Sequence, residues 1–183
     1  MFGIPFLDNS ILYFFNKTLY NIYIAKFFEI ITYDLGDKFP LFAIIIPFIF
    51  LIVDKKYGKK LFSLFFSSYI ISFIVSFIIK NTIRRPRPYL TQSFVNKIIL
   101  ENGYSFPSNH SLFAFLIAML LTYRYEKYAP LWFGLALLMA IARVYEGVHY
   151  PSDVFFGGII GILIGYIVIK YKDKIYHLFR IDI

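Results

Sequence analysis

The sequence contains no cysteine and few acidic residues, and each scarcity excludes a kind of site. Without cysteine the protein forms no disulfide and offers no thiolate metal ligand, so cysteine usage gives no information about redox compartment. Its 11 aspartates and glutamates form no cluster of the hard oxygen ligands that Mg²⁺ needs. The N-terminus lacks the positive region and cleavage site of a secretory signal. We therefore expect no metal, no cofactor and no cleaved leader.

Apolar residues, by contrast, make up 59% of the 183 residues. The mean hydropathy of +0.66 exceeds what a soluble domain needs for its core. Because a membrane span takes about 20 residues, the chain has room for one domain of roughly five or six spans. We predict an all-α fold, a polytopic membrane helix bundle that forms a single domain over residues 1–183. Its environment is the lipid bilayer, and we expect no nucleic-acid partner; the residues specify no oligomeric state.

Long apolar runs mark the expected spans. Five are clear, and they are residues 39–53, 61–80, 108–123, 130–145 and 153–171. The first of these is shorter and contains Pro47. Residues 11–31 are also apolar but carry Lys17, Lys26 and Glu29, and charges near a bilayer centre cost about 2.5–3.5 kcal/mol. This segment either crosses the membrane or lies along it.

The cations between the spans predict an orientation. They concentrate in residues 54–60, in residues 124–127 and in the tail after residue 169, which fall on one face of the bundle. By the positive-inside rule that face is cytoplasmic. Cations also occur on the opposite side, and we attribute those to function rather than to topology. The protein is thus expected in the cytoplasmic (inner) membrane, with its polar motifs on the periplasmic or extracellular face.

Three polar motifs, residues 80–88, 107–110 and 143–153, fall at the outer ends of the spans. Phosphate binding needs fixed donors that replace its hydration, and an arginine supplies two at once. The first and third motifs provide such cations, which are Lys80, Arg87 and Arg143. The second motif opens a helix, where unpaired N–H groups and the helix dipole form an anion site. Its donors are Ser108, Asn109 and His110.

An alternative for these cations is a purely interfacial role, in which they contact lipid headgroups as Lys and Arg do beside many spans. We prefer that interpretation for Arg84, Arg85 and Lys97. Chance would rarely place two histidines, three cations and an aspartate together at outer helix ends. We therefore interpret the other residues as one site for phosphoryl chemistry on a lipid.

Two histidines suit a metal-free phosphoryl transfer, which needs a nucleophile on one side of phosphorus and a proton donor on the other. His149 and His110 are the candidates, because His177 lies in the tail on the cytoplasmic side, where we expect it to be solvated or interfacial. Asp153 follows His149 by four residues, so it can accept from one imidazole nitrogen and leave the other free to attack. Its alternative role is that of an ordinary carboxylate at a helix N-terminus.

These motifs resemble the signature of the type-2 phosphatidic acid phosphatase superfamily, which reads K-x6-RP, PSGH and SR-x5-H-x3-D. All three spacings are met between residues 80 and 153. The resemblance implies a six-helix core, with residues 11–31 as its first span. It also implies that His149 attacks phosphorus to form a phosphohistidine, that Asp153 orients it, and that His110 protonates the leaving oxygen. The cations that hold the phosphate would be Lys80, Arg87 and Arg143.

Two positions depart from that signature. Asn109 replaces the glycine of the second motif; it keeps its backbone N–H and could add a side-chain contact that narrows the substrate range. Ala142 stands where a serine usually precedes the arginine, and it forfeits one hydroxyl donor. Glu146 has three open roles, because it could pair with Arg143, contact substrate or face water. The glycines that repeat at four-residue spacing in the last span are assigned to close helix packing.

The predicted function is metal-independent dephosphorylation of a membrane lipid phosphate or pyrophosphate. No sizeable soluble domain lies above the site, so the substrate should be an amphiphile whose tail stays among the helices. Undecaprenyl pyrophosphate and lipid A 1-phosphate are the leading candidates, with phosphatidylglycerol phosphate and phosphatidic acid as alternatives within the family. Another class also stays open, a non-catalytic lipid-binding membrane protein that retains the fold.

Overall fold

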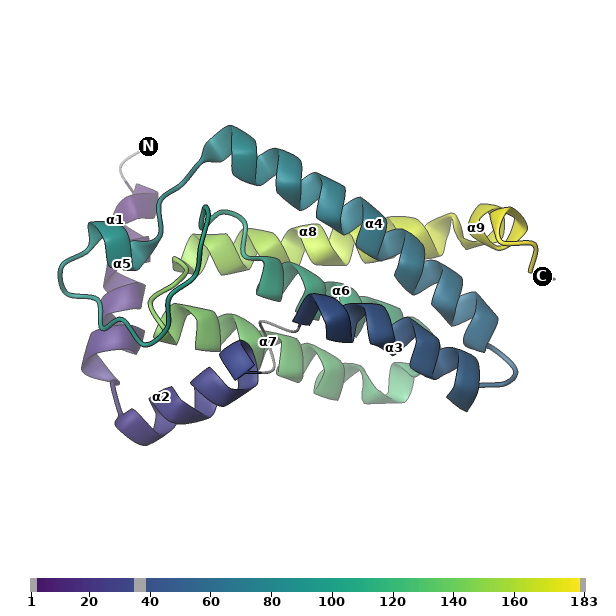
Figure 1. Ribbon diagram of the computed structural model, residues 1–183, viewed down its shortest axis with the longest axis horizontal. Coiled ribbons are helices and arrows are strands. Elements are labelled where there is room, and N and C mark those ends of the chain that lie inside the picture. Colours follow the sequence, from purple (N-terminus) through teal and green to yellow (C-terminus); the bar gives the residue numbers. More distant parts are fainter. Residues whose placement is uncertain (1–2, 35–38, 182–183) are drawn as a thin grey trace.

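The structure of the protein, a computed structural model, describes residues 3–34 and 39–181, and it is helical with no strand in those ranges (Figure 1). Its helices are α1 (Gly3–Tyr13), α2 (Ile22–Glu29), α3 (Phe39–Val53), α4 (Gly58–Ile83), α5 (Pro88–Thr91), α6 (Asn109–Arg124), α7 (Ala129–Tyr145), α8 (Pro151–Lys170) and α9 (Lys172–Leu178). The π-turns η1 (Phe14–Thr18) and η2 (Ile30–Asp34) follow α1 and α2, and the 3-10 turn η3 (Glu126–Tyr128) precedes α7. The predicted all-α fold is confirmed.

Three stretches in the described part of the chain are long and apolar enough to cross a membrane, and they are Gly58–Thr91, Glu126–Tyr145 and Pro151–Lys170. They coincide with three of the predicted spans. The predicted spans at 39–53 and 108–123 form α3 and α6, which are helices of 15 and 16 residues. Both are shorter than the roughly 20 residues that cross the hydrocarbon core, so the six-span count stays a prediction.

Residues 11–31 do not form the single helix that the expected first span requires. The helix α1 runs into η1, and α2 starts afresh after Asn21, whose side chain accepts hydrogen bonds from the N–H groups of Tyr23 and Ile24 at 2.9 and 3.3 Å. Figure 1 shows α2 turned away from the direction of α1. Asparagine is favoured at an N-cap, and the Asn21 N–H also donates to the Tyr145 hydroxyl at 2.7 Å. These polar contacts replace the expected spanning helix by two helices.

Glycines let α8 lie directly against α6. A Cβ on Gly157 would come within 2.7 Å of the Ser108 carbonyl oxygen, and one on Gly161 would collide with the α6 backbone. A Cβ on Gly165 would also be crowded by an α6 side chain, so the assignment of these glycines to close packing is confirmed. The Ser108 N–H donates to the Asp153 carbonyl at 3.1 Å. The second and third polar motifs are therefore joined backbone to backbone.

Two main apolar clusters hold the bundle together. The first joins α4, α6, α8 and α9 around Leu64, Phe65 and Leu116. The second joins α1, α7, α8 and the connection between α5 and α6 around Leu12 and Val144. The second cluster lies beside the chain segments that carry the polar motifs, so it positions their ends.

One end of the bundle, which we call the basic end, collects the α3–α4 turn, the α6–α7 connection and α9 (Figure 1). Arg124 of α6 pairs with Asp54 of the α3–α4 turn at 3.1 Å. Lys172 of α9 lies 5.3 Å from the ring centroid of Tyr123 in α6. The three cation-rich segments therefore share one end, as the sequence predicted.

Candidate active site

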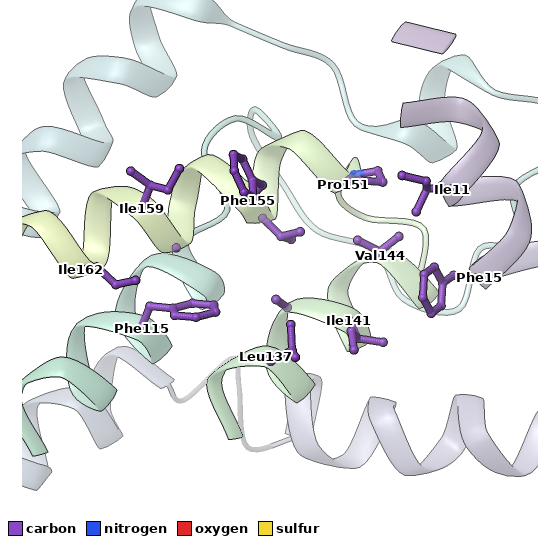
Figure 2. A pocket seen from close by; sticks show the side chains of 13 residues that line it. Ile11, Phe15, Phe115, Leu137, Ile141, Val144, Pro151, Phe155, Ile159 and Ile162 are labelled. Carbon is purple, nitrogen blue, oxygen red and sulfur yellow. The ribbon is translucent and has the colours of Figure 1, made fainter. Parts of the chain in front are cut away.

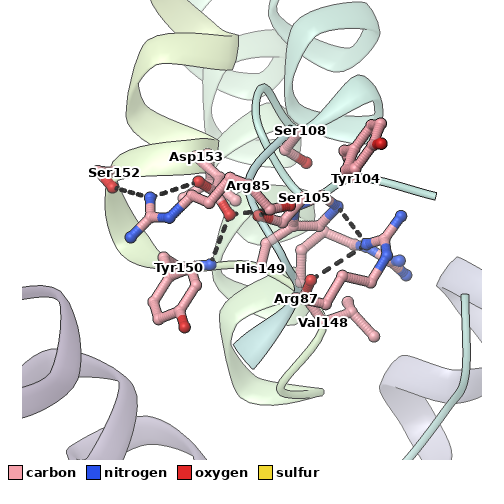
Figure 3. Close-up of polar contacts among 12 residues, drawn as sticks. Arg85, Arg87, Tyr104, Ser105, Ser108, Val148, His149, Tyr150, Ser152 and Asp153 are labelled. Atoms are coloured by element: carbon pink, nitrogen blue, oxygen red, sulfur yellow. Dashed lines mark hydrogen bonds and ion pairs between the residues drawn. The ribbon is translucent and has the colours of Figure 1, made fainter. Parts of the chain in front are cut away.

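The three polar motifs meet at the end of the bundle opposite the basic end, and Figure 3 shows part of this region from close by. Lys80 lies in the last turn of α4, and Arg87 immediately precedes α5. The second motif opens α6, and the turn between α7 and α8 carries His149. The structure thus brings the eight residues of the predicted site into one region, where they differ in what they contact.

His149 is buried and faces a charged group on each side. Its Nδ1 lies 3.6 Å from Asp153 Oδ2, and its Nε2 lies 3.3 Å from Arg87 Nη1. Burial lowers the pKa of His149 well below its ordinary value of 6.5, and the positive charges of Arg87, Arg143 and Lys80 act in the same direction. The imidazole is therefore neutral at pH 7, the form in which one ring nitrogen keeps a lone pair.

Asp153 is fully buried and anchored at both oxygens. Its Oδ2 accepts from the Tyr150 N–H at 2.9 Å, and its Oδ1 accepts from Arg85 Nη1 at 2.6 Å. The bond to Tyr150 is the ordinary contact of a carboxylate at a helix N-terminus, so that alternative describes part of its role. The bond to Arg85 goes further, because it fixes the carboxylate on the Nδ1 side of His149.

Arg85 corrects a sequence prediction. We expected an interfacial anchor, but its guanidinium bridges Asp153 and Asp8, the latter at 2.7 Å, and lies 3.8 Å from the ring centroid of Tyr150. Asp8 belongs to α1 and also accepts from the hydroxyl of Ser152 at 2.6 Å. The Arg85 side chain is only 25% exposed. Arg85 therefore belongs to the site through its contact with Asp153, which lies beside His149. No motif around Asp8 in the sequence indicated that it pairs with Arg85.

Lys80 and Arg87 both hold the connection between α5 and α6. Lys80 Nζ donates to the Tyr104 carbonyl at 2.8 Å. Arg87 donates from Nε to the Gly103 carbonyl and from Nη2 to the Asn102 carbonyl, both at 3.1 Å. These two cations therefore shape the backbone that covers the site as well as facing its centre.

Arg143 has no exposed side-chain surface and pairs with two carboxylates. Its Nη1 donates to Glu146 at 2.8 Å, and its Nη2 pairs with Glu101. Of the three roles left open for Glu146, the structure shows the pairing with Arg143, and the Thr32 hydroxyl also donates to it. Burial raises the pKa of Glu146, and the charge of Arg143 opposes that rise.

The second motif divides its contacts between helix capping and the site. Ser108 caps α6 and accepts from the Ser111 N–H at 3.4 Å. Asn109 accepts from the hydroxyl of Ser76 in α4, so its side chain contacts that helix rather than the cations. His110 Nδ1 lies 3.9 Å from Glu101 Oε1 and is the group of this motif that faces the cluster.

Ala142, the other departure from the family signature, lies in helix packing. It is buried in an apolar cluster with Ala25 and Phe28 of α2 and with Tyr145. The position where the signature has serine is therefore apolar in this protein.

Glu101 is a second site residue that the sequence interpretation missed. Its carboxylate lies 2.9 Å from Arg87 Nη1, pairs with Arg143, and comes within 3.9 Å of a ring nitrogen of His110 and of His149. The sequence could have indicated Glu101, because no other acidic residue occurs between positions 55 and 125. A single carboxylate in a long connection between cationic motifs indicates a partner for those cations.

The arrangement suits anion chemistry beside an imidazole. Arg87, Arg143 and the two histidines surround one position, now taken by the Glu101 carboxylate. Within residues 3–34 and 39–181, no group of three or more His, Asp or Glu side chains is placed to hold a metal ion.

Comparison with family models identifies the class of this helical, cation-lined site. The model of the PAP2 superfamily matches residues 61–176, which include all three polar motifs. The chain belongs to the PAP2 superfamily.

Several curated proteins resemble part of the chain. It is 41% identical over 78 residues to the bacitracin transport permease protein BcrC of Bacillus licheniformis, a match that covers 42% of this chain and 38% of the relative. It is 31% identical to phosphatidylglycerophosphatase B of Bacillus subtilis, with 52% and 50% covered, and 30% identical to undecaprenyl-diphosphatase BcrC of the same organism, with 48% and 46% covered. The chain spans half or less of the length of these relatives.

Two solved structures share the fold over most of their length. The crystal structure of Aquifex aeolicus LpxE matches with a TM-score of 0.76 and 29% identity, covering 89% of this chain and 94% of that chain. A transmembrane PAP2-type phosphatidylglycerolphosphate phosphatase from Bacillus subtilis matches with a TM-score of 0.71 and 23% identity, covering 95% and 88%. The helix arrangement is thus that of a transmembrane PAP2 protein.

Proposed function

We propose that the protein is a lipid phosphatase that removes phosphate from a membrane lipid phosphate or pyrophosphate without a metal ion. The position of His149 carries the proposal. Its neutral imidazole lies between the anchored carboxylate of Asp153 and Arg87, at 3.6 and 3.3 Å. A phosphate held by the cations of the site would therefore meet Nε2 directly.

In the first step, His149 Nε2 attacks phosphorus and the bond from phosphorus to the leaving oxygen breaks. Protonated His110 gives its proton to that oxygen, and Asp153 stabilises the positive charge that develops on the His149 ring. Lys80, Arg87 and Arg143 stabilise the charge on the equatorial oxygens, and one such donor is worth about a hundredfold or more in rate.

In the second step, His110 takes a proton from a water molecule, and the oxygen of that water attacks the phosphohistidine. The bond from phosphorus to His149 breaks, inorganic phosphate leaves, and both histidines return to their starting protonation states. The same histidine thus acts as an acid and then as a base.

An amphiphilic substrate fits the surroundings of the site. An apolar pocket of about 340 Å³ adjoins α7 and α8, with lining residues that include Ile11, Phe115 and Leu137 (Figure 2). Val144 and Pro151 also line it, and they flank the turn that carries His149. A hydrocarbon chain in this pocket would keep its lipid close to the phosphate-binding cations.

Undecaprenyl pyrophosphate and lipid A 1-phosphate are the leading substrates in this proposal, with phosphatidylglycerol phosphate and phosphatidic acid as alternatives. The similarity to an undecaprenyl-diphosphatase and to a phosphatidylglycerophosphatase supports members of both groups. A panel of these lipids, supplied to purified protein with a chelator present, tests activity, metal need and substrate together through phosphate release.

The phosphohistidine has its own test. We expect His149→Ala to abolish turnover and rapidly quenched wild-type protein to carry acid-labile phosphate on His149. His177→Ala is the matched control, because His177 is exposed in α9 at the basic end, and it should keep wild-type activity. If no lipid phosphate is hydrolysed while His149→Ala still binds lipid, the protein is a non-catalytic lipid-binding protein. Phosphate on another residue would refute the assigned nucleophile.

The site is proposed to face the periplasm or the cell exterior. The cation-rich segments at the opposite end of the bundle support this orientation by the positive-inside rule. Because the chain has no cysteine, single-cysteine variants report sidedness cleanly. A membrane-impermeant maleimide should label Ser93→Cys in intact cells and should leave Lys56→Cys unlabelled until the membrane is opened; the reverse pattern inverts the topology.

A further inference from the structure

Glu101 lies where the proposed reaction needs the phosphoryl oxygens of the substrate. Its Oε2 is 2.9 Å from Arg87 Nη1 and 3.9 Å from His149 Nε2. Its Oε1 pairs with Arg143 and is 3.9 Å from His110 Nδ1. Arginine binds a carboxylate through the same planar fork that it offers to phosphate. The carboxylate and a substrate phosphate therefore compete for the same donors.

The backbone around Glu101 has hydrogen bonds of its own, in addition to the contacts of the carboxylate. The Tyr89 hydroxyl donates to the Glu101 carbonyl, and Arg87 donates to the carbonyls of the next two residues. Lys80 donates to the Tyr104 carbonyl. The Glu101 side chain remains 17% exposed, so the carboxylate can leave the cations by rotation of its own bonds while the main chain stays in place.

We propose that Glu101 is an internal competitor that keeps weakly binding anions out of the active site. This inference rests on the proposed function. A bilayer holds a large excess of phosphodiester lipids, whose headgroup phosphate carries one charge and could occupy the cations. A terminal phosphate carries about −1.5 to −2 charges at pH 7 and offers one more free oxygen. It gains more from Arg87 and Arg143, so it displaces the carboxylate where a diester does not.

Competition by Glu101 lowers the apparent affinity of the site for external anions by a definite factor. A site filled by its own carboxylate about nine-tenths of the time binds every external anion roughly tenfold more weakly. The factor is the same for strong and weak ligands, so it leaves their ratio unchanged. What changes is the occupancy of the site. The weakened affinity for diester headgroups is too low for these abundant lipids to fill the site, whereas the weakened affinity for terminal phosphates is still high enough to fill it.

The first experiment titrates purified protein with inorganic phosphate by calorimetry. We expect Glu101→Gln, which keeps the side-chain volume and removes the charge, to bind phosphate about tenfold more tightly than the wild type. Glu126→Gln is the matched control, since Glu126 is exposed at the basic end, and its phosphate affinity should equal that of the wild type. Equal or weaker phosphate binding by Glu101→Gln overturns the inference, because Glu101 would then only arrange the cations.

The second experiment measures hydrolysis of the substrate found in the lipid panel, in vesicles with and without phosphatidylglycerol, a phosphodiester. The wild type should be insensitive to the added diester, and Glu101→Gln should be inhibited by it. If both proteins respond alike, the inference fails although the proposed function stands. If the wild type hydrolyses no lipid phosphate, the proposed function fails while the phosphate titration still decides the competition.

Glu101→Asp keeps the test decisive if the glutamine variant unfolds. Aspartate retains the charge but is one methylene shorter, so it reaches Arg87 and Arg143 less well, and phosphate affinity should rise to a value between those of the wild type and Glu101→Gln. An affinity at or below the wild-type value contradicts the competition.

Discussion

The two ends of the bundle both gather cations but use them differently. At the basic end, Arg124 is 34% exposed, pairs with Asp54, and lies over the rings of Tyr57 and Tyr125. At the site end, Arg143 has no exposed surface and pairs with carboxylates. A charge at the surface is solvated and can exchange partners, whereas a buried one must be neutralised where it lies. Both arginines pair with carboxylates, so burial, rather than the number of cations or the kind of partner, distinguishes the two ends.

Arg143→Ala should have the largest effect at the site end. It leaves the Glu146 carboxylate buried without its cation, so we expect a loss of about 3–5 kcal/mol in unfolding free energy and no measurable turnover. Denaturant titration in detergent and phosphate release check the two effects. The double variant Arg143→Met with Glu146→Gln removes both charges and should recover most of the stability but none of the activity. Recovery of activity would contradict a phosphate-binding role.

Arg85→Ala should affect catalysis more than folding, because in the proposed mechanism Arg85 holds Asp153, which orients His149. We expect kcat to fall about 10–100-fold with little change in KM. Steady-state kinetics on the best lipid of the panel check this, and Arg85→Lys should restore part of kcat. The neighbouring exposed residue provides the control, since Arg84→Ala should keep kcat within a factor of about two. Equal losses of kcat in Arg85→Ala and Arg84→Ala would contradict this role and support the interfacial role first expected for Arg85.

Acidification should destabilise the site end through His149. Above pH 6.5 the ring is neutral in both the folded and the unfolded protein, so it contributes no pH dependence. Below that value the unfolded chain binds a proton that the buried ring, with its lowered pKa, does not, and stability falls as the pH drops. Between pH 7.5 and 5.5 the loss is up to about 1.4 kcal/mol. Thermal unfolding of wild type and His149→Gln at both pH values should show a smaller change in the variant.

The ion pair at the basic end should have the smallest effect. Arg124→Ala and Asp54→Asn should each cost no more than about 1 kcal/mol, and a double-mutant cycle should give a coupling within the same limit. Raising the salt concentration should shrink that coupling further. A coupling of several kcal/mol would show that this exposed ion pair is as strong as a buried one, and it would contradict the difference drawn between the two ends.

The sequence predicted the parts of the site that short spacings encode. Lys80 and Arg87 fall within one motif, and His149 and Asp153 are four residues apart, so their proximity follows from local geometry. The helical character and the close packing of α8 likewise follow from long apolar runs and from the glycine spacing. The convergence of the motifs could be inferred because successive spans alternate in direction, so the end of one run and the start of the next lie on the same side.

Contacts between distant segments could not be predicted in this way. The Asp8–Arg85 pair joins residues 77 positions apart, and nothing local links Glu101 to Arg143. The break inside residues 11–31 depends on a hydrogen bond from Asn21 to the Tyr145 hydroxyl, 124 positions away. The residues alone left open whether this segment crosses the membrane or lies along it, and the family resemblance favoured a single spanning helix, which these tertiary hydrogen bonds interrupt.

The contact between Ser108 and α8 has a consequence for how the protein could change. The Ser108 N–H bonds to the Asp153 carbonyl, and the absent side chain of Gly157 makes room for the Ser108 carbonyl. The spacing of the helix starts next to His110 and His149 is therefore set by main-chain atoms, which side-chain substitutions other than those at Gly157 leave in place. Residues that line the apolar pocket can vary around this fixed frame, so under the proposed function new lipid preferences can arise while the histidines keep their places.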